Sequence, residues 1–342
     1  MRRCRKGEAV ALLRIHFTGQ DMVRTTLADE PDPMWEVLLS LHQLQGRDGM
    51  AHYGTWRERA RRVLPRSAAG LLQLAPPHGY SPDFLTPAEP TTSFESGVER
   101  VMSTSPTRLR EELELLAVRR PRTTWTRDLA SGRANAIHGL GQALRNYHQQ
   151  AIAPYWASIR ALVRADHQQQ VGHLSGAGVE QLLGRLHPSV RWNSPVLEIS
   201  GFADRDVYLD GRGLRLQPAV FCWMTPTKLH DPELQPVLVY PVQHIPGTLR
   251  RITTESRSQP LAALLGTTRA AALEAIAGGC TTTVLAERCQ ISLAGASRQA
   301  GILRDAGLIT TRRAGQAVQH DLTLLGKAVL TGGFLQDPER LN

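Results

Sequence analysis

The chain of 342 residues has little cysteine, few aromatic residues and no long apolar run. Its cysteines, Cys4, Cys222, Cys280 and Cys289, are too few and too irregularly spaced for the disulfide framework of a secreted domain. The longest apolar run near the start, Ala9 to Leu13, is far shorter than the ~20 residues of a bilayer span. We therefore expect no membrane span, and a protein of the reducing cytoplasm.

Lysine is also scarce, although the chain is basic. The sequence carries 40 Lys and Arg against 31 Asp and Glu, a net charge of +9, yet lysine occurs only at positions 6, 228 and 327. A surplus of positive charge favours a polyanionic partner, and it favours nucleic acid more than a membrane surface. Two explanations of the arginine excess stay open: codon bias, or selection of guanidinium groups for phosphates and guanine edges.

The composition of 42% hydrophobic and 21% charged residues is that of a folded globular protein. The length predicts two domains. We expect a basic leader over residues 1–12, either disordered or the product of a misassigned start, and a large α+β domain over 13–250. A connector over 251–260, a second domain over 261–332 and a tail over 333–342 follow.

Local signals predict the elements of the large domain. Alternating residues predict a strand from Leu13 to Thr18, and capping residues predict helices after Thr18, Asp32 and Ser105. A long amphipathic stretch, Ala136 to Asp166, is crossed by Pro154. Short runs after Pro188 predict strands, which are Val196–Ile199, Asp206–Asp210, Leu214–Leu216 and Val237–Tyr240. Asp210–Gly213 has the composition of a hairpin turn between two of them.

Residues 261–330 contain no aromatic residue and follow a different pattern. A first helix is expected to end at Gly278 and Gly279, and Thr281 to Thr283 can cap a second. A tight turn at Cys289–Ile291 leads to Ser292, which can begin a third helix through Leu303. Residues 308–322 then predict a two-stranded hairpin. This order of elements is that of a helix-turn-helix followed by a wing.

This segment resembles the winged helix of ArsR-like bacterial repressors. The resemblance rests on Leu285–Arg288, Ile291–Ser292, Ala296–Gln299, Leu303–Ile309 and Arg312–Gly315, about a fifth of the chain. More faintly, Leu13–Leu44 resembles the start of the long N-terminal domain of some actinobacterial regulators. The implied fold is α+β and mostly helical: a large N-terminal α+β regulatory domain followed by a C-terminal winged helix-turn-helix.

The resemblance also implies a DNA interface. Ser292 to Arg304 would be the recognition helix for the major groove, and Arg312, Arg313 and Gln316 would belong to the wing. The full expected set is Thr282, Ser292, Leu293, Ala294, Ser297, Arg298, Gln299, Arg304, Arg312, Arg313 and Gln316. Gln290 replaces the usual turn glycine, and Gln299 replaces a common histidine. Leu293 and Ala294 suit thymine methyl groups, which leaves Arg298 and Gln299 as polar readers. The alternative is that the arginines are ordinary solvated charges.

The same residues do not predict a metal site or a catalytic site. Cys280 and Cys289 lie nine positions apart without further thiol or imidazole ligands nearby, and the histidines show no ligand spacing. No nucleophile elbow, phosphate loop or dinucleotide fingerprint is present in the sequence. We expect no cofactor, no metal and no enzymatic activity.

Aromatic residues gather where the helical pattern gives way to strands. We list as candidate ligand contacts Tyr147, Tyr155, Trp156, Trp192, Phe221 and Trp223. They could line an apolar pocket for a small organic effector, or they could be the core of a large domain. Both interpretations stay open.

The sequence thus predicts a sequence-specific, DNA-binding transcriptional regulator, a repressor that responds to a ligand through its N-terminal domain. We expect a homodimer on an inverted-repeat operator of double-stranded DNA, paired in part through Leu324, Leu325, Ala328 and Val329, and located at the nucleoid. The alternatives are a ligand-independent or architectural DNA-binding protein, and an enzyme with an appended DNA-binding domain.

Overall fold

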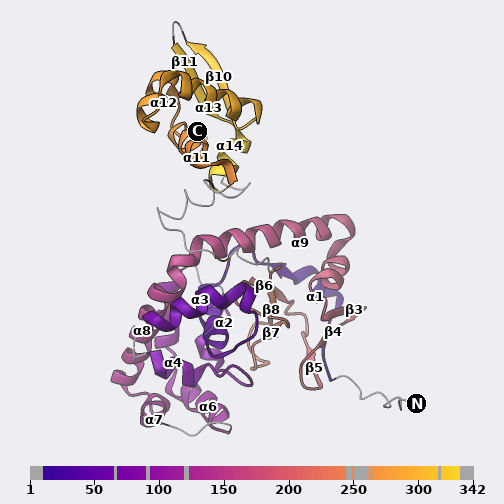
Figure 1. The fold of residues 1–342 in the computed structure, drawn as a ribbon. Helices are drawn as coiled ribbons and strands as arrows, with labels where there is room; N and C mark the ends of the chain where they lie inside the picture. Colours follow the sequence, from indigo (N-terminus) through magenta and orange to yellow (C-terminus); the bar gives the residue numbers. More distant parts are fainter. Residues whose placement is uncertain are drawn as a thin grey trace, which may run out of the picture. The chain divides into compact units, whose positions relative to one another are not determined.

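The computed structural model describes residues 11–64, 68–89, 93–118, 123–243, 249, 261, 264–314 and 317–331. The chain divides into two compact units, residues 1–250 and 251–342 (Figure 1). Both contain helices and strands, so the protein is α+β with helices predominating. Most of the predicted leader, the connector 251–260 and the tail 333–342 lie outside the described residues.

Most helices of unit 1 belong to one helical layer. The predicted starts after Thr18, Asp32 and Ser105 are confirmed: the Asp32 carboxylate accepts hydrogen bonds from the N–H groups of Met34 and Trp35, and Pro33 occupies the first helical position. The helices are α1 (Gly19–Arg24), α2 (Pro33–Gln45), α3 (Met50–Val63), α4 (Ala69–Leu74), η2 (Asp83–Leu85), α5 (Phe94–Met102), α6 (Pro106–Ala117), α7 (Thr124–Ala130), α8 (Ala134–Tyr147) and α9 (Trp156–Arg185).

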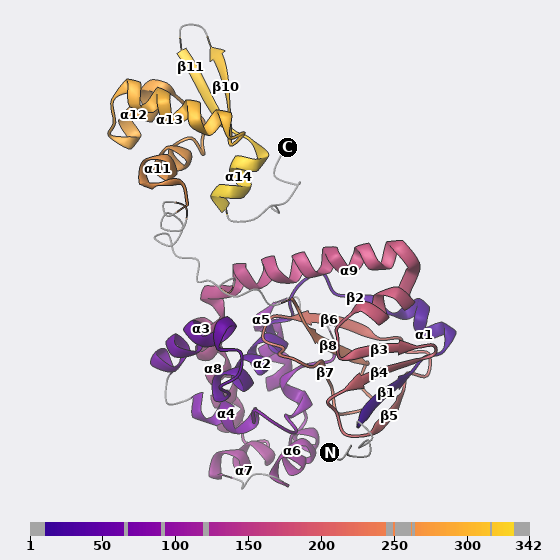
Figure 2. The ribbon, with the colours of Figure 1, turned by 45° about the vertical axis from the view of Figure 1, so that its right-hand side comes forward.

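Pro154 divides the long amphipathic stretch into two helices. The chain between α8 and α9 forms a π turn, η3 (His148–Ile152), and a 3₁₀ turn, η4 (Ala153–Tyr155). Because proline has no N–H to donate, the regular α-helical ladder stops there. The second helix, α9, then runs along the strands and contacts β3 (Val190–Asn193) and β6 (Arg215–Ala219) (Figure 2).

Two four-stranded sheets complete unit 1. The first has the order β3-β4-β1-β5, with β1 (Leu12–His16) antiparallel to β4 (Val196–Ser200) and parallel to β5 (Arg205–Tyr208). The second has the order β2-β6-β8-β7, with β2 (Thr26–Leu27), β7 (Thr227–Lys228) and β8 (Val237–Pro241). The strand predicted at Leu13 is confirmed, with Leu13 and Ile15 buried on one face.

The hairpin predicted at Asp210–Gly213 is wrong, because β5 and β6 belong to different sheets. The turn itself exists, with positive φ at Asp210, Gly211 and Gly213. However, the N–H of Gly213 donates to the Asp21 carboxylate at 2.9 Å, and a Cβ on Gly213 would lie 2.5 Å from the carbonyl oxygen of Arg24. These contacts with α1 fix the direction of the chain after the turn, so that β6 joins the second sheet and does not pair with β5.

The described residues of unit 2 pack four helices and a small sheet around one apolar core. Its helices are α11 (Thr267–Ala275), α12 (Thr282–Cys289), α13 (Leu293–Asp305) and α14 (Leu324–Thr331). Its antiparallel sheet has the order β10-β11-β9, formed by β10 (Ile309–Ala314), β11 (Ala317–Leu322) and β9 (Cys280–Thr281). Leu273, Ile276, Leu285, Ala296 and Leu303 are buried at its centre.

Candidate nucleic-acid interface

A three-residue turn joins α12 to α13. Gln290 adopts a left-handed conformation with φ of 53°, and the N–H of Ile291 donates to the carbonyl oxygen of Ala286 at 3.0 Å. A non-glycine side chain is disfavoured in this region of φ, so the turn holds Gln290 in an uncommon conformation. Ser292 then caps α13, because its hydroxyl accepts the N–H of Gly295 at 3.1 Å.

The first two turns of α13 present one face to solvent. Leu293, Ala294, Ser297 and Arg298 are exposed there, and Leu293 exposes 56% of its surface. Ala296, Ala300 and Leu303 are buried on the opposite face. The predicted contacts on this helix thus share one surface, because residues three and four positions apart lie on the same side of an α-helix.

Gln299 does not belong to that surface, which corrects its assignment as a base reader. Its side chain is only partly exposed, and the amide oxygen is buried without a hydrogen-bond partner in the part of the chain that the structure describes. It follows Arg298 by one position, which corresponds to a rotation of about 100° around the helix and turns it toward the core.

Thr282 and the hairpin are joined by a histidine that the sequence did not single out. The Nε2 atom of His320 lies 2.9 Å from the Thr282 hydroxyl, and its Nδ1 atom lies 3.0 Å from the Thr311 hydroxyl. Burial lowers the pKa of His320, the positive charge of Arg304 lowers it further, and Asp321 opposes this effect. The Thr282 hydroxyl is therefore held by His320 within unit 2, and its contact with DNA stays a prediction.

The hairpin carries the remaining predicted cations. Arg312 and Arg313 are exposed on β10, where they pair in register with Gln319 and Val318. Since successive side chains of a strand point to opposite faces, only one of these arginines can face a given surface. Arg312 lies 3.4 Å from the carboxylate of Asp321, and Gln316 lies outside the described residues.

The charge of this unit is positive. Between residues 264 and 331 the sequence has seven Lys and Arg and four Asp and Glu, a surplus of three positive charges. Arg304 is exposed at the end of α13, but its guanidinium pairs with the neighbouring Asp305 at 3.0 Å. Arg298 has no hydrogen-bond or ion-pair partner among the described residues and is thus available to an external acceptor.

The structure corrects the proposed aromatic pocket. Tyr147, Tyr155 and Phe221 are buried in the core of the helical layer, and Trp156 and Trp223 pack against that core. Trp192 packs against a second apolar core, where its ring and that of Phe17 lie nearly perpendicular with centroids 5.2 Å apart. Five of the six side chains thus pack in one apolar core and Trp192 in another, which agrees with the interpretation of the pattern as core.

The acidic, histidine and cysteine side chains of the described residues do not gather into a metal site. The described residues contain no group of three or more histidine, cysteine, aspartate and glutamate side chains that could hold a metal ion. Cys280 and Cys289 are free, and burial raises the pKa of both thiols. No helix in the described ranges is long and apolar enough to cross a membrane.

Comparison with known proteins gives no family. No protein-family model matches the chain, and no curated protein or solved structure is significantly similar to it.

Proposed function

We propose that this protein is a sequence-specific DNA-binding transcriptional regulator. In this proposal unit 2 is a winged helix-turn-helix, α13 enters the major groove as the recognition helix, and the β10–β11 hairpin is a wing beside the phosphate backbone. The major groove of B-DNA is about 12 Å wide and accepts an α-helix.

The observation that carries the proposal is the solvent-facing surface of α13. Leu293 and Ala294 expose apolar groups that suit the methyl group of thymine, and Arg298 offers a guanidinium with no partner among the described residues.

Loss of a base contact and loss of a phosphate contact should affect DNA binding differently. Arg298→Ala should weaken binding to a selected operator by about 1–3 kcal/mol and relax the preference at one base pair, because it removes a base contact. Arg312→Ala should weaken binding to all sequences about equally and reduce the salt slope by about one, because it removes a phosphate contact.

The measurement begins with operator selection from random duplex DNA by the full-length protein, followed by fluorescence-anisotropy titrations at several salt concentrations. Arg269→Ala, an exposed arginine on α11 outside the proposed interface, is the control and should bind like the unmodified protein. If no sequence is enriched, or if both test variants match the control, the proposed interface is wrong.

A further inference from the structure

Unit 1 contains a cavity that none of the predicted residues lines. Its volume is about 430 Å³, and it lies between β5 and the segment 228–237 that connects β7 to β8. Ligand pockets in proteins span about 300–1,000 Å³. Its apolar lining includes Val207, Leu209, Leu214, Leu229 and Leu234.

One wall of this cavity is a sheet edge. β5 is the last strand of the order β3-β4-β1-β5, and no strand among the described residues pairs with its other side. The N–H of Leu209 donates to the carbonyl oxygen of His16 in β1 at 3.2 Å. Because alternate residues of a strand direct their backbone groups to opposite sides, the N–H groups of Asp206 and Tyr208 point to the free edge. These are donors without strand partners.

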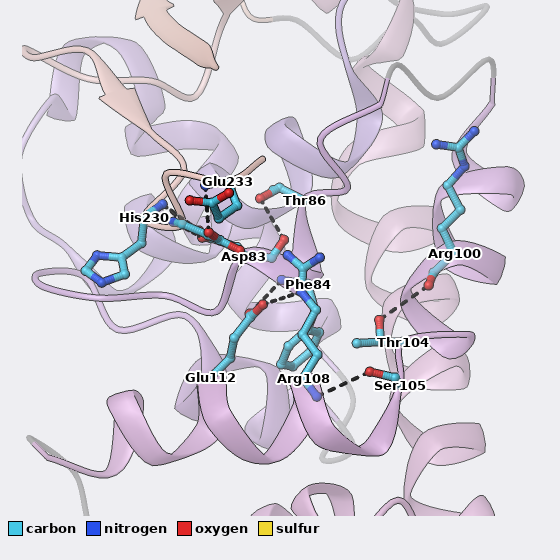
Figure 3. A network of polar contacts seen from close by, with 11 residues as sticks. Asp83, Phe84, Thr86, Arg100, Thr104, Ser105, Arg108, Glu112, His230 and Glu233 are labelled. Carbon is cyan, nitrogen blue, oxygen red and sulfur yellow. Dashed lines mark hydrogen bonds and ion pairs between the residues drawn. The ribbon is translucent and has the colours of Figure 1, made fainter. Parts of the chain in front are cut away.

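The opposite wall is held by a buried carboxylate. Asp83 accepts the N–H of His230 at 2.9 Å and the N–H of Asp231 at 2.7 Å (Figure 3). Beside it, Glu112 accepts the N–H of Phe84 at 2.8 Å and pairs with Arg108. The segment that lines the cavity is thus fixed by hydrogen bonds to the helical layer, and the cavity is preformed.

Arg212 closes one end of the cavity. Its guanidinium donates to the carbonyl oxygens of Tyr208 and Leu209 at 2.9 Å, and across the gap to those of Pro232 and Leu234. An added β-strand would need to run past this point along the edge of β5. The cross-link blocks such a strand, which favours a compact ligand over an extended peptide.

Two cations of the lining, Lys228 and Arg205, lie close enough to affect each other, and the ammonium group of Lys228 donates one hydrogen bond, to the carbonyl oxygen of Leu229 at 2.7 Å. Lys228 is half-buried, and burial together with the nearby positive charge of Arg205 lowers its pKa, although Asp83 opposes this effect. Among the lining acids, Asp206 pairs with His16 at 2.7 Å, and Asp231 accepts the N–H of Glu233 at 2.9 Å. The other lining carboxylates, those of Asp210 and Glu233, belong to exposed residues.

We propose that this cavity binds a small organic acid, with its carboxylate at Lys228 and Arg205 and its apolar body against the leucines of the lining. A carboxylate supplies an acceptor for the remaining N–H groups of Lys228, for the guanidinium of Arg205 and for the free N–H groups of β5, and it relieves the repulsion between the cations. The proposal concerns unit 1 alone, so it stands independently of DNA binding.

The test uses the full-length protein and two probes of equal shape, 2-naphthoate and its neutral amide 2-naphthamide, in calorimetric titrations. Naphthoate should bind, and the amide should bind at least about tenfold more weakly, because one charged hydrogen bond is worth about that factor. Lys228→Met and Arg205→Met should each weaken the binding of naphthoate by a similar factor. Arg110→Met removes an exposed arginine of α6, outside the cavity, and should change nothing.

Arg205 is exposed, so its variant tests the charge without disturbing the fold if Lys228→Met unfolds the protein. The proposal is overturned if naphthoate does not bind, if the amide binds equally well, or if Arg205→Met binds naphthoate like Arg110→Met.

Discussion

At the scale of single residues, the buried carboxylate of Glu36 makes stability depend on pH. It lies in α2 and accepts the N–H groups of Val220 at 2.8 Å and Phe221 at 3.0 Å. Burial raises the pKa of Glu36 from 4.5 to about 7; these hydrogen bonds oppose the rise, and Asp32 adds to it. The folded state therefore holds the proton more tightly than the unfolded state. The resulting stabilisation is complete below pH 4.5 and is lost as the pH rises through about 7.

Glu36→Gln should remove this dependence. A difference of about 2.5 pKa units corresponds to about 3 kcal/mol, so the free energy of unfolding of the unmodified protein, relative to the variant, should fall by up to that amount between pH 5 and pH 8. Urea unfolding at both pH values measures it. Glu111→Gln, at an exposed position of α6, is the control and should follow the unmodified protein. Parallel pH curves for the protein and its Glu36 variant would contradict the prediction.

The sequence could not reveal Glu36, since a glutamate within a helix ordinarily faces solvent. Its burial depends on Val220 and Phe221, which are distant in the chain and offer two N–H groups at the end of β6. His320 was missed for the same reason: its partners Thr282 and Thr311 come together only in the folded unit. The exposed face of α13 was predictable because it depends on helical spacing alone.

At the scale of elements, α14 approaches the backbone of Leu308, the residue before β10, so closely that only glycine fits at the contact. A Cβ on Gly326 would lie 1.9 Å from the carbonyl oxygen of Leu308. Gly326→Ala must therefore push α14 away from the core, and it should lower the stability of unit 2 by about 1–3 kcal/mol.

Gly301→Ala in α13 is the matched control. A Cβ there meets nothing within 4 Å, so the substitution should stabilise the helix by about 0.5–1 kcal/mol. Thermal unfolding followed by circular dichroism compares the two variants. Shifts of the same sign in both would show that the close contact of Gly326 does not determine the position of α14.

Helices that begin at a capping residue are predictable from the sequence. Short strands that are defined only by hydrogen bonds to a neighbouring strand are not. α2, α6 and α13 begin at capping residues that the sequence displays. The two-residue strands β2 and β7 have no local signal and are defined by their partners β6 and β8. The turn after β5 is visible in the sequence. Whether it joins two paired strands is not, because the direction of the chain after the turn depends on its contact with α1.

At the scale of the whole molecule, the proposed function bears on how many copies of the chain bind one DNA site. Under the function proposed above, a single recognition helix would cover few base pairs, and DNA-binding proteins that use such helices commonly bind as dimers to half-sites about one helical turn apart. Of the residues expected to pair, Leu324 and Leu325 are exposed on α14, with 81% and 40% of their surfaces accessible. Ala328 is buried and Val329 packs against the core of unit 2, which corrects their assignment to a dimer surface.

We therefore predict that the full-length protein is a dimer at micromolar concentration and that the exposed leucines of α14 contribute to pairing. Light scattering coupled to size exclusion should give twice the mass of the chain, and an operator selected by the protein should be an inverted repeat occupied by two chains. Leu324→Glu should shift the equilibrium toward monomer, because a charge placed in an apolar interface loses its hydration. Leu264→Glu provides the control, since Leu264 is equally apolar and 77% exposed but lies outside α14. A monomer in both the presence and the absence of operator DNA would refute the dimer, and equal effects of the two substitutions would place the interface elsewhere.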